Sequence, residues 1–102
     1  FVLNNDGYTI EKYLNVKTQN QKYNKIPRWS YTKLAEAFGG NAFTAIVRTY
    51  GELEQAINQA EIECSERLCI IEMIAEDPLD APENMKKMYK YLEEQAMQRS
   101  KK

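Results

Sequence analysis

The sequence of 102 residues contains no histidine, and this absence excludes two kinds of site. Metal sites built on imidazole and His-based catalytic triads both require that side chain. Cysteine is scarce as well, because only Cys64 and Cys69 occur, five positions apart. That spacing matches no zinc-binding or redox motif. We expect both to be reduced thiols of a cytosolic protein, with Cys69 in a buried strand.

A surplus of charge and a long apolar run are also missing. The 14 basic and 15 acidic residues leave a net charge of −1, so no electrostatic argument exists for nucleic acid or an anionic membrane. No apolar run reaches the roughly 18 residues of a membrane-spanning helix, and no signal peptide is visible. We therefore expect a cytoplasmic protein with no nucleic-acid partner and no membrane association.

What is present is a chain that is 43% apolar, the length of one small domain or of part of a larger one. Residues 68–75 are almost continuously apolar, which is typical of a strand covered on both faces in a parallel sheet. Strands that alternate with helices imply right-handed crossovers. The sequence thus predicts an α/β fold, part of a doubly wound parallel sheet flanked by helices in three layers. The expected strands are residues 1–3, 42–48 and 68–75, and the expected helices lie near 10–14, 31–38, 52–64 and 85–96.

Several local signals accompany these elements. Ser30 is predicted to cap the helix at residues 31–38, and Gly39 with Gly40 to end it. Glu72 interrupts the apolar strand at 68–75. It is either a buried carboxylate with a function or, as we favour, a residue at a sheet edge or paired with a partner.

Residues 4–11 read Asn-Asn-Asp-Gly-Tyr-Thr-Ile-Glu and follow the first predicted strand. Ligands of open parallel sheets bind at the carboxyl ends of strands, and backbone N–H groups there can hold a diphosphate. An asparagine amide oxygen and a glycine carbonyl are hard ligands suited to Mg²⁺. Glu11 lies one helical turn after Gly7, so its carboxylate can project toward the same cleft. Considered without a family, the same residues are more simply a turn and a solvated helix residue.

The eight-residue block resembles the second half of the thiamine diphosphate motif, in the variant of the pyruvate, indolepyruvate and branched-chain 2-oxo-acid decarboxylases. The Tyr-Thr-Ile-Glu continuation makes the resemblance specific, and it covers nearly the whole chain. Further matching segments follow in order: Tyr23-Asn24, Ile26-Pro27 with Trp29, Tyr31 through Gly39, Val47-Arg48-Thr49 and Asp80-Ala81-Pro82.

The resemblance implies a role for each of five residues. Asn5 and the Gly7 carbonyl would bind Mg²⁺, which bridges to the cofactor diphosphate, and Tyr8 would lie close to that diphosphate. Ile10 would line the substrate pocket, and Glu11 would be the catalytic acid/base. The resemblance further implies that residues 1–102 are the C-terminal part of a diphosphate-binding domain. The complete enzyme would convert a 2-oxo acid to an aldehyde and CO₂ with thiamine diphosphate and Mg²⁺.

The chain also departs from the family pattern. Where the family usually has His-Gly after the short helix, this sequence has Asn15-Val16, followed by apparently extra residues between Lys17 and Lys22. The Gly-Asp-Gly half of the motif and the domain that activates the aminopyrimidine are not present. Since Phe1 already lies in an apolar run, we expect a cut through a longer sequence. The partner would then be the missing N-terminal portion, in a complete enzyme that is expected to be a homo-oligomer, and this chain alone would be inactive. The alternative is a non-catalytic remnant that persists as a small α/β interaction module.

Overall fold

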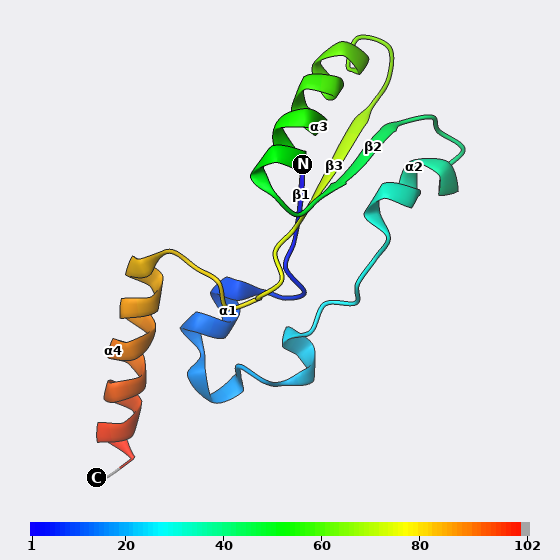
Figure 1. The fold of residues 1–102 in the computed structure, drawn as a ribbon. Helices are drawn as coiled ribbons and strands as arrows, with labels where there is room; N and C mark the ends of the chain where they lie inside the picture. Colours follow the sequence, from blue (N-terminus) through cyan, green and yellow to red (C-terminus); the bar gives the residue numbers. More distant parts are fainter. Residues whose placement is uncertain (101–102) are drawn as a thin grey trace. The chain divides into compact units, whose positions relative to one another are not determined.

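A computed structural model describes residues 1–100, which divide into two compact units. The first, called the sheet unit here, consists of residues 1–4 and 28–76. The second, called the motif unit because it carries residues 5–11, consists of residues 5–27 and the segment from residue 77 onward. Figure 1 colours both units along the sequence. Within the described residues, no helix combines the length and apolarity required to cross a membrane.

The sheet unit is built on three parallel strands, as the alternation of strand and helix predicts. The order is β1 (Val2–Asn4), β3 (Cys69–Ile74) and β2 (Phe43–Val47), so the last strand in sequence is the central one. Its position explains why residues 68–75 are apolar without alternation, since a central strand meets covering elements on both faces. The predicted fold class is therefore confirmed.

One face of this sheet packs on helix α3 (Tyr50–Glu63) and forms the core of the unit. Val47, Ala56 and Ile71 are its buried members, and Ile71 is only 2% exposed. The predicted apolar stripe of the helix is confirmed, because Leu53, Ile57 and Ala60 pack against these three. The helix begins at Tyr50, two residues before the predicted start at residue 52, because Thr49 and Glu52 form a reciprocal capping box.

The opposite face carries a shorter helical segment, visible beside β2 in Figure 1. A 3₁₀ turn, η3 (Tyr31–Lys33), runs into the single-turn helix α2 (Leu34–Ala37), where the sequence predicted one helix. The predicted cap is wrong, since the Ser30 side chain makes no capping hydrogen bond. The predicted stop is confirmed: Gly39 has φ of 75°, a left-handed conformation that glycine adopts without steric cost.

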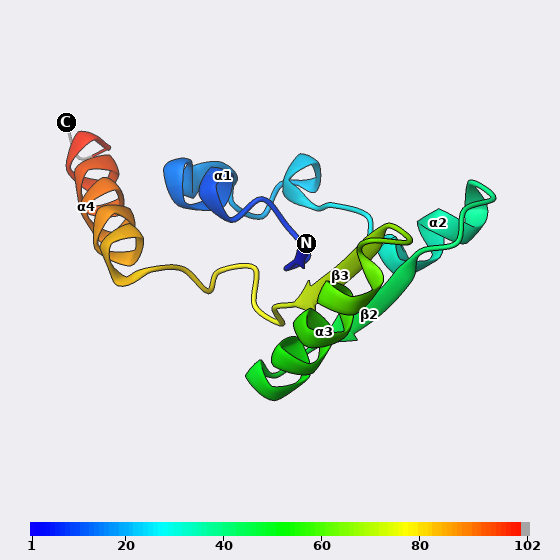
Figure 2. The ribbon, with the colours of Figure 1, turned by 90° about the horizontal axis from the view of Figure 1, so that it is seen from above.

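The motif unit contains helices α1 (Thr9–Leu14) and α4 (Glu83–Arg99), with two 3₁₀ turns, η1 (Val16–Thr18) and η2 (Lys22–Asn24), in the predicted loop. Helix α1 contacts α4, and the two tyrosine rings of Tyr13 and Tyr89 meet edge to face with centroids 5.3 Å apart. Tyr13 is the single buried apolar side chain among the described residues of this unit. Figure 2 shows α1 and α4 from above.

Candidate functional site

The predicted metal-binding turn begins directly after β1 and contains two hydrogen bonds of the Asn5 side chain. The Asn5 side chain bridges it, because its Nδ2 donates to Thr9 Oγ1 at 2.6 Å and its Oδ1 accepts from Gly7 N at 3.4 Å. Asp6 has φ of 59° and takes the left-handed conformation of the turn. Aspartate is one of the few non-glycine residues that tolerates this conformation. The turn thus holds the Asn5 side chain beside the backbone N–H of Gly7.

Gly7 lies in a crowded part of the turn, and its backbone is not in the left-handed conformation. A Cβ at this position would lie 3.1 Å from Cε and Nζ of Lys12 and 3.4 Å from Cβ of Pro78. The residue is buried and forms an isolated antiparallel bridge with Lys25. The lysine ammonium group therefore lies beside the turn, and its positive charge favours an anion at this position.

The other three predicted site residues lie at the start of α1, on the surface. Tyr8 precedes the helix and is 54% exposed, Ile10 is 44% exposed, and Glu11 is exposed in the first turn. No hydrogen bond or ion pair joins Glu11 to another side chain within residues 1–100. The structure therefore places all five residues on one continuous segment, with Tyr8, Ile10 and Glu11 on the surface.

Helix α1 is only six residues long, and its position depends on the segment that precedes α4. Thr9 Oγ1 donates to the Pro78 carbonyl at 2.8 Å, and Tyr13 Oη donates to the Leu79 carbonyl. Nucleating so short a helix costs more than its own hydrogen bonds return, so these tertiary bonds are needed to stabilise it. Residues 78 and 79 were not recognised from sequence as part of the site, because a backbone carbonyl leaves no signal in the sequence.

The oxygen donors of the turn have the right chemistry for Mg²⁺ but are too few. Asn5 Oδ1 accepts one long hydrogen bond, and a carbonyl oxygen can accept two, so it retains the capacity to bind a cation. With the Gly7 carbonyl it would supply two of the about six oxygens that Mg²⁺ takes. Residues 1–100 contain no group of three His, Cys, Asp or Glu side chains that could complete the set. The remaining ligands must come from the diphosphate, from water or from other protein segments.

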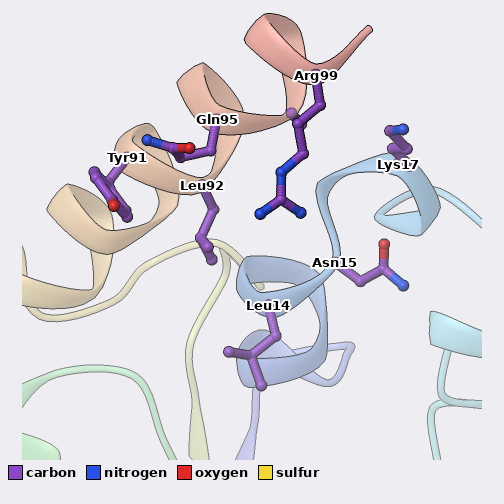
Figure 3. Close-up of a pocket in the computed structure, with 8 residues that line it drawn as sticks. Leu14, Asn15, Lys17, Tyr91, Leu92, Gln95 and Arg99 are labelled. Atoms are coloured by element: carbon purple, nitrogen blue, oxygen red, sulfur yellow. The ribbon is translucent and has the colours of Figure 1, made fainter.

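One pocket of the motif unit lies away from this turn. It has a volume of about 400 Å³ and lies between α4 and the end of α1, where Arg99 extends toward Asn15 (Figure 3). None of the five predicted site residues lines it. Its lining carries no carboxylate and no element of the motif, so we assign the site to the turn and not to this pocket. The lining residues are Leu14, Asn15, Lys17, Tyr91, Leu92, Gln95, Ala96 and Arg99.

One polar pair next to the turn was only half anticipated from the sequence. Glu72 lies on the central strand β3, so its favoured placement at a sheet edge is wrong, whereas its pairing with a partner is confirmed. The carboxylate is also buried, as the less favoured interpretation had it. The partner is Asn4, whose Nδ2 donates to Glu72 Oε1 at 2.7 Å. No signal of sequence spacing links residues 68 positions apart.

Comparison with known proteins identifies the family of this chain. The family model described as the thiamine pyrophosphate enzyme, C-terminal TPP binding domain, matches residues 1–73. That range includes the whole turn, β1, β2 and all of β3 except its last residue, Ile74. The chain belongs to this family, and the resemblance predicted from residues 4–11 is confirmed.

Within the family, the chain is similar to pyruvate decarboxylases. It is 38% identical over 89 residues to pyruvate decarboxylase of Aspergillus parasiticus. The aligned residues cover 81% of this chain and 15% of that protein. It is 44% identical over 77 residues to pyruvate decarboxylase 2 of Zea mays, covering 72% of this chain and 69% of that sequence. For pyruvate decarboxylase 3 of Arabidopsis thaliana the identity is 43%, over 72% of this chain and 12% of that protein. The chain thus spans about 15% or less of the Aspergillus and Arabidopsis relatives.

Proposed function

We propose that this chain is the C-terminal part of the diphosphate-binding domain of a thiamine diphosphate- and Mg²⁺-dependent decarboxylase. The substrate is a 2-oxo acid such as pyruvate or indolepyruvate, and the products are an aldehyde and CO₂. The observation that carries the proposal is the bonded turn at Asn5 and Gly7, which lies inside the matched family range of residues 1–73. The similarity to pyruvate decarboxylases supports the reaction type.

Each of the five residues has a defined task in this proposal. Asn5, through Oδ1, and Gly7, through its carbonyl, hold the metal ion, and Tyr8 contacts the diphosphate. The Lys12 ammonium group beside Gly7 opposes a bare cation, so the ion is bound together with its diphosphate anion. Thiamine diphosphate supplies, when bound, a sink for the electrons left by the departing CO₂.

The acid/base task falls on Glu11. A carboxyl group near the reacting carbon can deliver or accept a proton if its surroundings favour the protonated form. Glu11 is exposed in the described structure, so enclosure must come from further protein segments or from the bound substrate. Ile10, next to it on α1, supplies an apolar wall that helps to exclude water.

The rest of the enzyme is the proposed partner of the sheet unit. Phe1 and Leu3 are 76% and 64% exposed, and the outer edge of β1 pairs with no described strand. A groove of about 320 Å³ runs between Phe1 and α3, with an almost entirely apolar lining that includes Ile57 and Ile71. Exposed apolar surface of this kind marks an interface. We propose that the N-terminal portion of the same polypeptide covers it, in a homo-oligomeric enzyme of the cytoplasm, where free thiols such as Cys64 and Cys69 stay reduced.

The test compares two proteins. A full-length polypeptide that contains this chain should release CO₂ and aldehyde from pyruvate or indolepyruvate only with thiamine diphosphate and Mg²⁺ present. The 102-residue chain alone should bind neither thiamine diphosphate nor Mg²⁺ with useful affinity, because it holds only two of the metal ligands. Asn5→Ala in the full-length protein should weaken retention of Mg²⁺ and cofactor first. A full-length protein that folds but never decarboxylates a 2-oxo acid would favour the non-catalytic interaction module instead.

A further inference from the structure

Glu72 is a carboxylate in the middle of an apolar strand, and its burial needs a reason. It is 4% exposed, and the residues paired with it in register on the two neighbouring strands are Val2 and Ile46. Burying a carboxylate away from water costs several kcal/mol unless it is hydrogen-bonded. The side chain therefore depends on the partner that this fold supplies.

That partner is Asn4, the last residue of β1. Its side chain is 7% exposed, and the 2.7 Å bond from Nδ2 to Glu72 Oε1 has the length of a charge-assisted hydrogen bond. The Asn4 carbonyl also accepts from Ala75 N at 2.9 Å. The side chain of Asn4 is thus bound to β3 and its main chain to Ala75, the residue that follows β3, immediately before the turn begins at Asn5.

Stability alone does not account for this pair. Replacing a buried polar or ionic pair by apolar residues of similar volume is often neutral or stabilising. What the pair does supply is register. β1 is three residues long and offers little apolar pattern to select one alignment, and a shift by one residue would turn Asn4 toward the opposite face, away from Glu72. The same shift would move the start of the turn by about 3.3 Å along the strand.

We propose that the Asn4–Glu72 hydrogen bond is a register lock that positions the metal-binding turn, which makes Glu72 a positioning residue for Asn5. The inference rests on the proposed function, since it assigns the lock to a metal site. Mg²⁺ accepts only near-ideal octahedral geometry at about 2.0–2.1 Å, so a displacement on the scale of a residue would abolish coordination by Asn5. The sheet core on the α3 face does not depend on the pair.

The decisive variant removes the lock without leaving an unpaired group. In the full-length holoenzyme, the double variant Asn4→Val/Glu72→Met should keep or raise the melting temperature. Its affinity for Mg²⁺, titrated in the presence of thiamine diphosphate by calorimetry, should fall about 10-fold to 100-fold, the usual effect of losing a group that orients a metal ligand. Glu72→Gln keeps an acceptor oxygen for Asn4, so its affinity for Mg²⁺ should be much closer to that of the unmodified protein. Ile71→Ala is the matched control, because it damages the same strand on the other face.

A second measurement does not depend on the metal. Hydrogen exchange at the Ala75 amide, which donates to Asn4, should accelerate in the double variant, while exchange at Ile71 should not. Unchanged exchange at Ala75 overturns the lock, and faster exchange with unchanged Mg²⁺ affinity overturns its positioning role. The proposal is also overturned if the double variant binds less Mg²⁺ only because less of the protein is folded, which is the result expected for Ile71→Ala. Failure of the proposed function looks different, because then neither the unmodified protein nor Asn5→Ala shows Mg²⁺-dependent cofactor binding.

Discussion

The sheet unit and the motif unit are stabilised by different interactions. The sheet unit has a core of Val47, Ala56 and Ile71 beneath α3, and its strands pair in a continuous parallel ladder. The motif unit has one buried apolar side chain among its described residues, Tyr13, and is joined by hydrogen bonds to backbone carbonyls. All five predicted site residues belong to the unit with the smaller core. Functional segments often come from the less stable parts of a protein, because binding there can complete the structure.

The largest expected effect concerns chemistry in the motif unit. In the full-length enzyme, Glu11→Gln should lower turnover by about 10²-fold to 10⁴-fold, the usual contribution of a positioned acid/base. Cofactor affinity should change little, because Asn5 and Gly7 are the proposed anchors. Steady-state decarboxylation and a cofactor titration measure the two effects separately. Glu54→Gln on α3, also an exposed helical glutamate, is the control and should leave turnover unchanged. Normal turnover in Glu11→Gln would make that residue an ordinary surface carboxylate.

The next effect tests the core of the sheet unit. Ile71→Ala should cost about 2–5 kcal/mol of unfolding free energy, because it removes most of a side chain that is buried beneath α3. Denaturant unfolding of the 102-residue chain, followed by circular dichroism, gives the value. Ile62→Ala, at a position on α3 that is 70% exposed, is the matched control. Equal losses in the two variants would show that the sheet unit has no specific core.

A smaller effect is expected at the start of α3. Thr49→Ala removes the side-chain oxygen that accepts from Glu52 N at 3.2 Å, and should cost about 1 kcal/mol. The loss should be confined to the sheet unit, which amide exchange along α3 would reveal. Thr49→Ser keeps the hydroxyl group and should restore most of the stability. If Thr49→Ser were as destabilised as Thr49→Ala, the capping bond would not be the cause.

The corresponding change in the motif unit is Tyr13→Phe. It removes the hydrogen bond to the Leu79 carbonyl but keeps the ring that packs on Tyr89, so the expected cost is about 0.5–1.5 kcal/mol. Amide exchange should accelerate in α1 and leave β2 and β3 unchanged. Tyr91→Phe, at a ring that is 61% exposed, is the control. Accelerated exchange throughout the sheet would mean that the two units unfold together.

The smallest expected effect is a pH dependence in the sheet unit. Hydrogen bonds from the backbone N–H of Arg48, and then of Thr49, hold the pKa of the Glu52 carboxyl below its ordinary value of 4.5. Because the folded-state pKa is the lower one, the stabilisation is fully present above about pH 4.5 and is lost as the pH falls through the lowered pKa. Unfolding measured between neutral and acid pH should show this loss, and Glu52→Gln should reduce it. An identical acid dependence in both proteins would exclude the cap as its source.

How much the sequence predicts differs between the two units for a physical reason. The helix at Tyr50–Glu63 was recognised because burial of one face imposes a helical period, and the strand at Cys69–Ile74 because cover on both faces leaves a continuous apolar run. The turn at residues 4–7 was also predicted, since Asn, Asp and Gly have local conformational preferences. The left-handed residue proved to be Asp6 and not Gly7, and no local preference encodes the close approach of the Lys12 side chain to Gly7.

The sequence by itself determined the family, the parallel α/β class and the five candidate site residues, because each depends on residue types at short spacing. Their functional roles stay predictions. The tertiary structure decided which strand is central, that Glu72 is buried against Asn4, and that α1 is held by the carbonyls of Pro78 and Leu79. These are contacts between residues 66 to 69 positions apart. Such contacts form only when the chain has folded, since burial and hydrogen bonding across the fold depend on where distant segments meet and not on any local pattern.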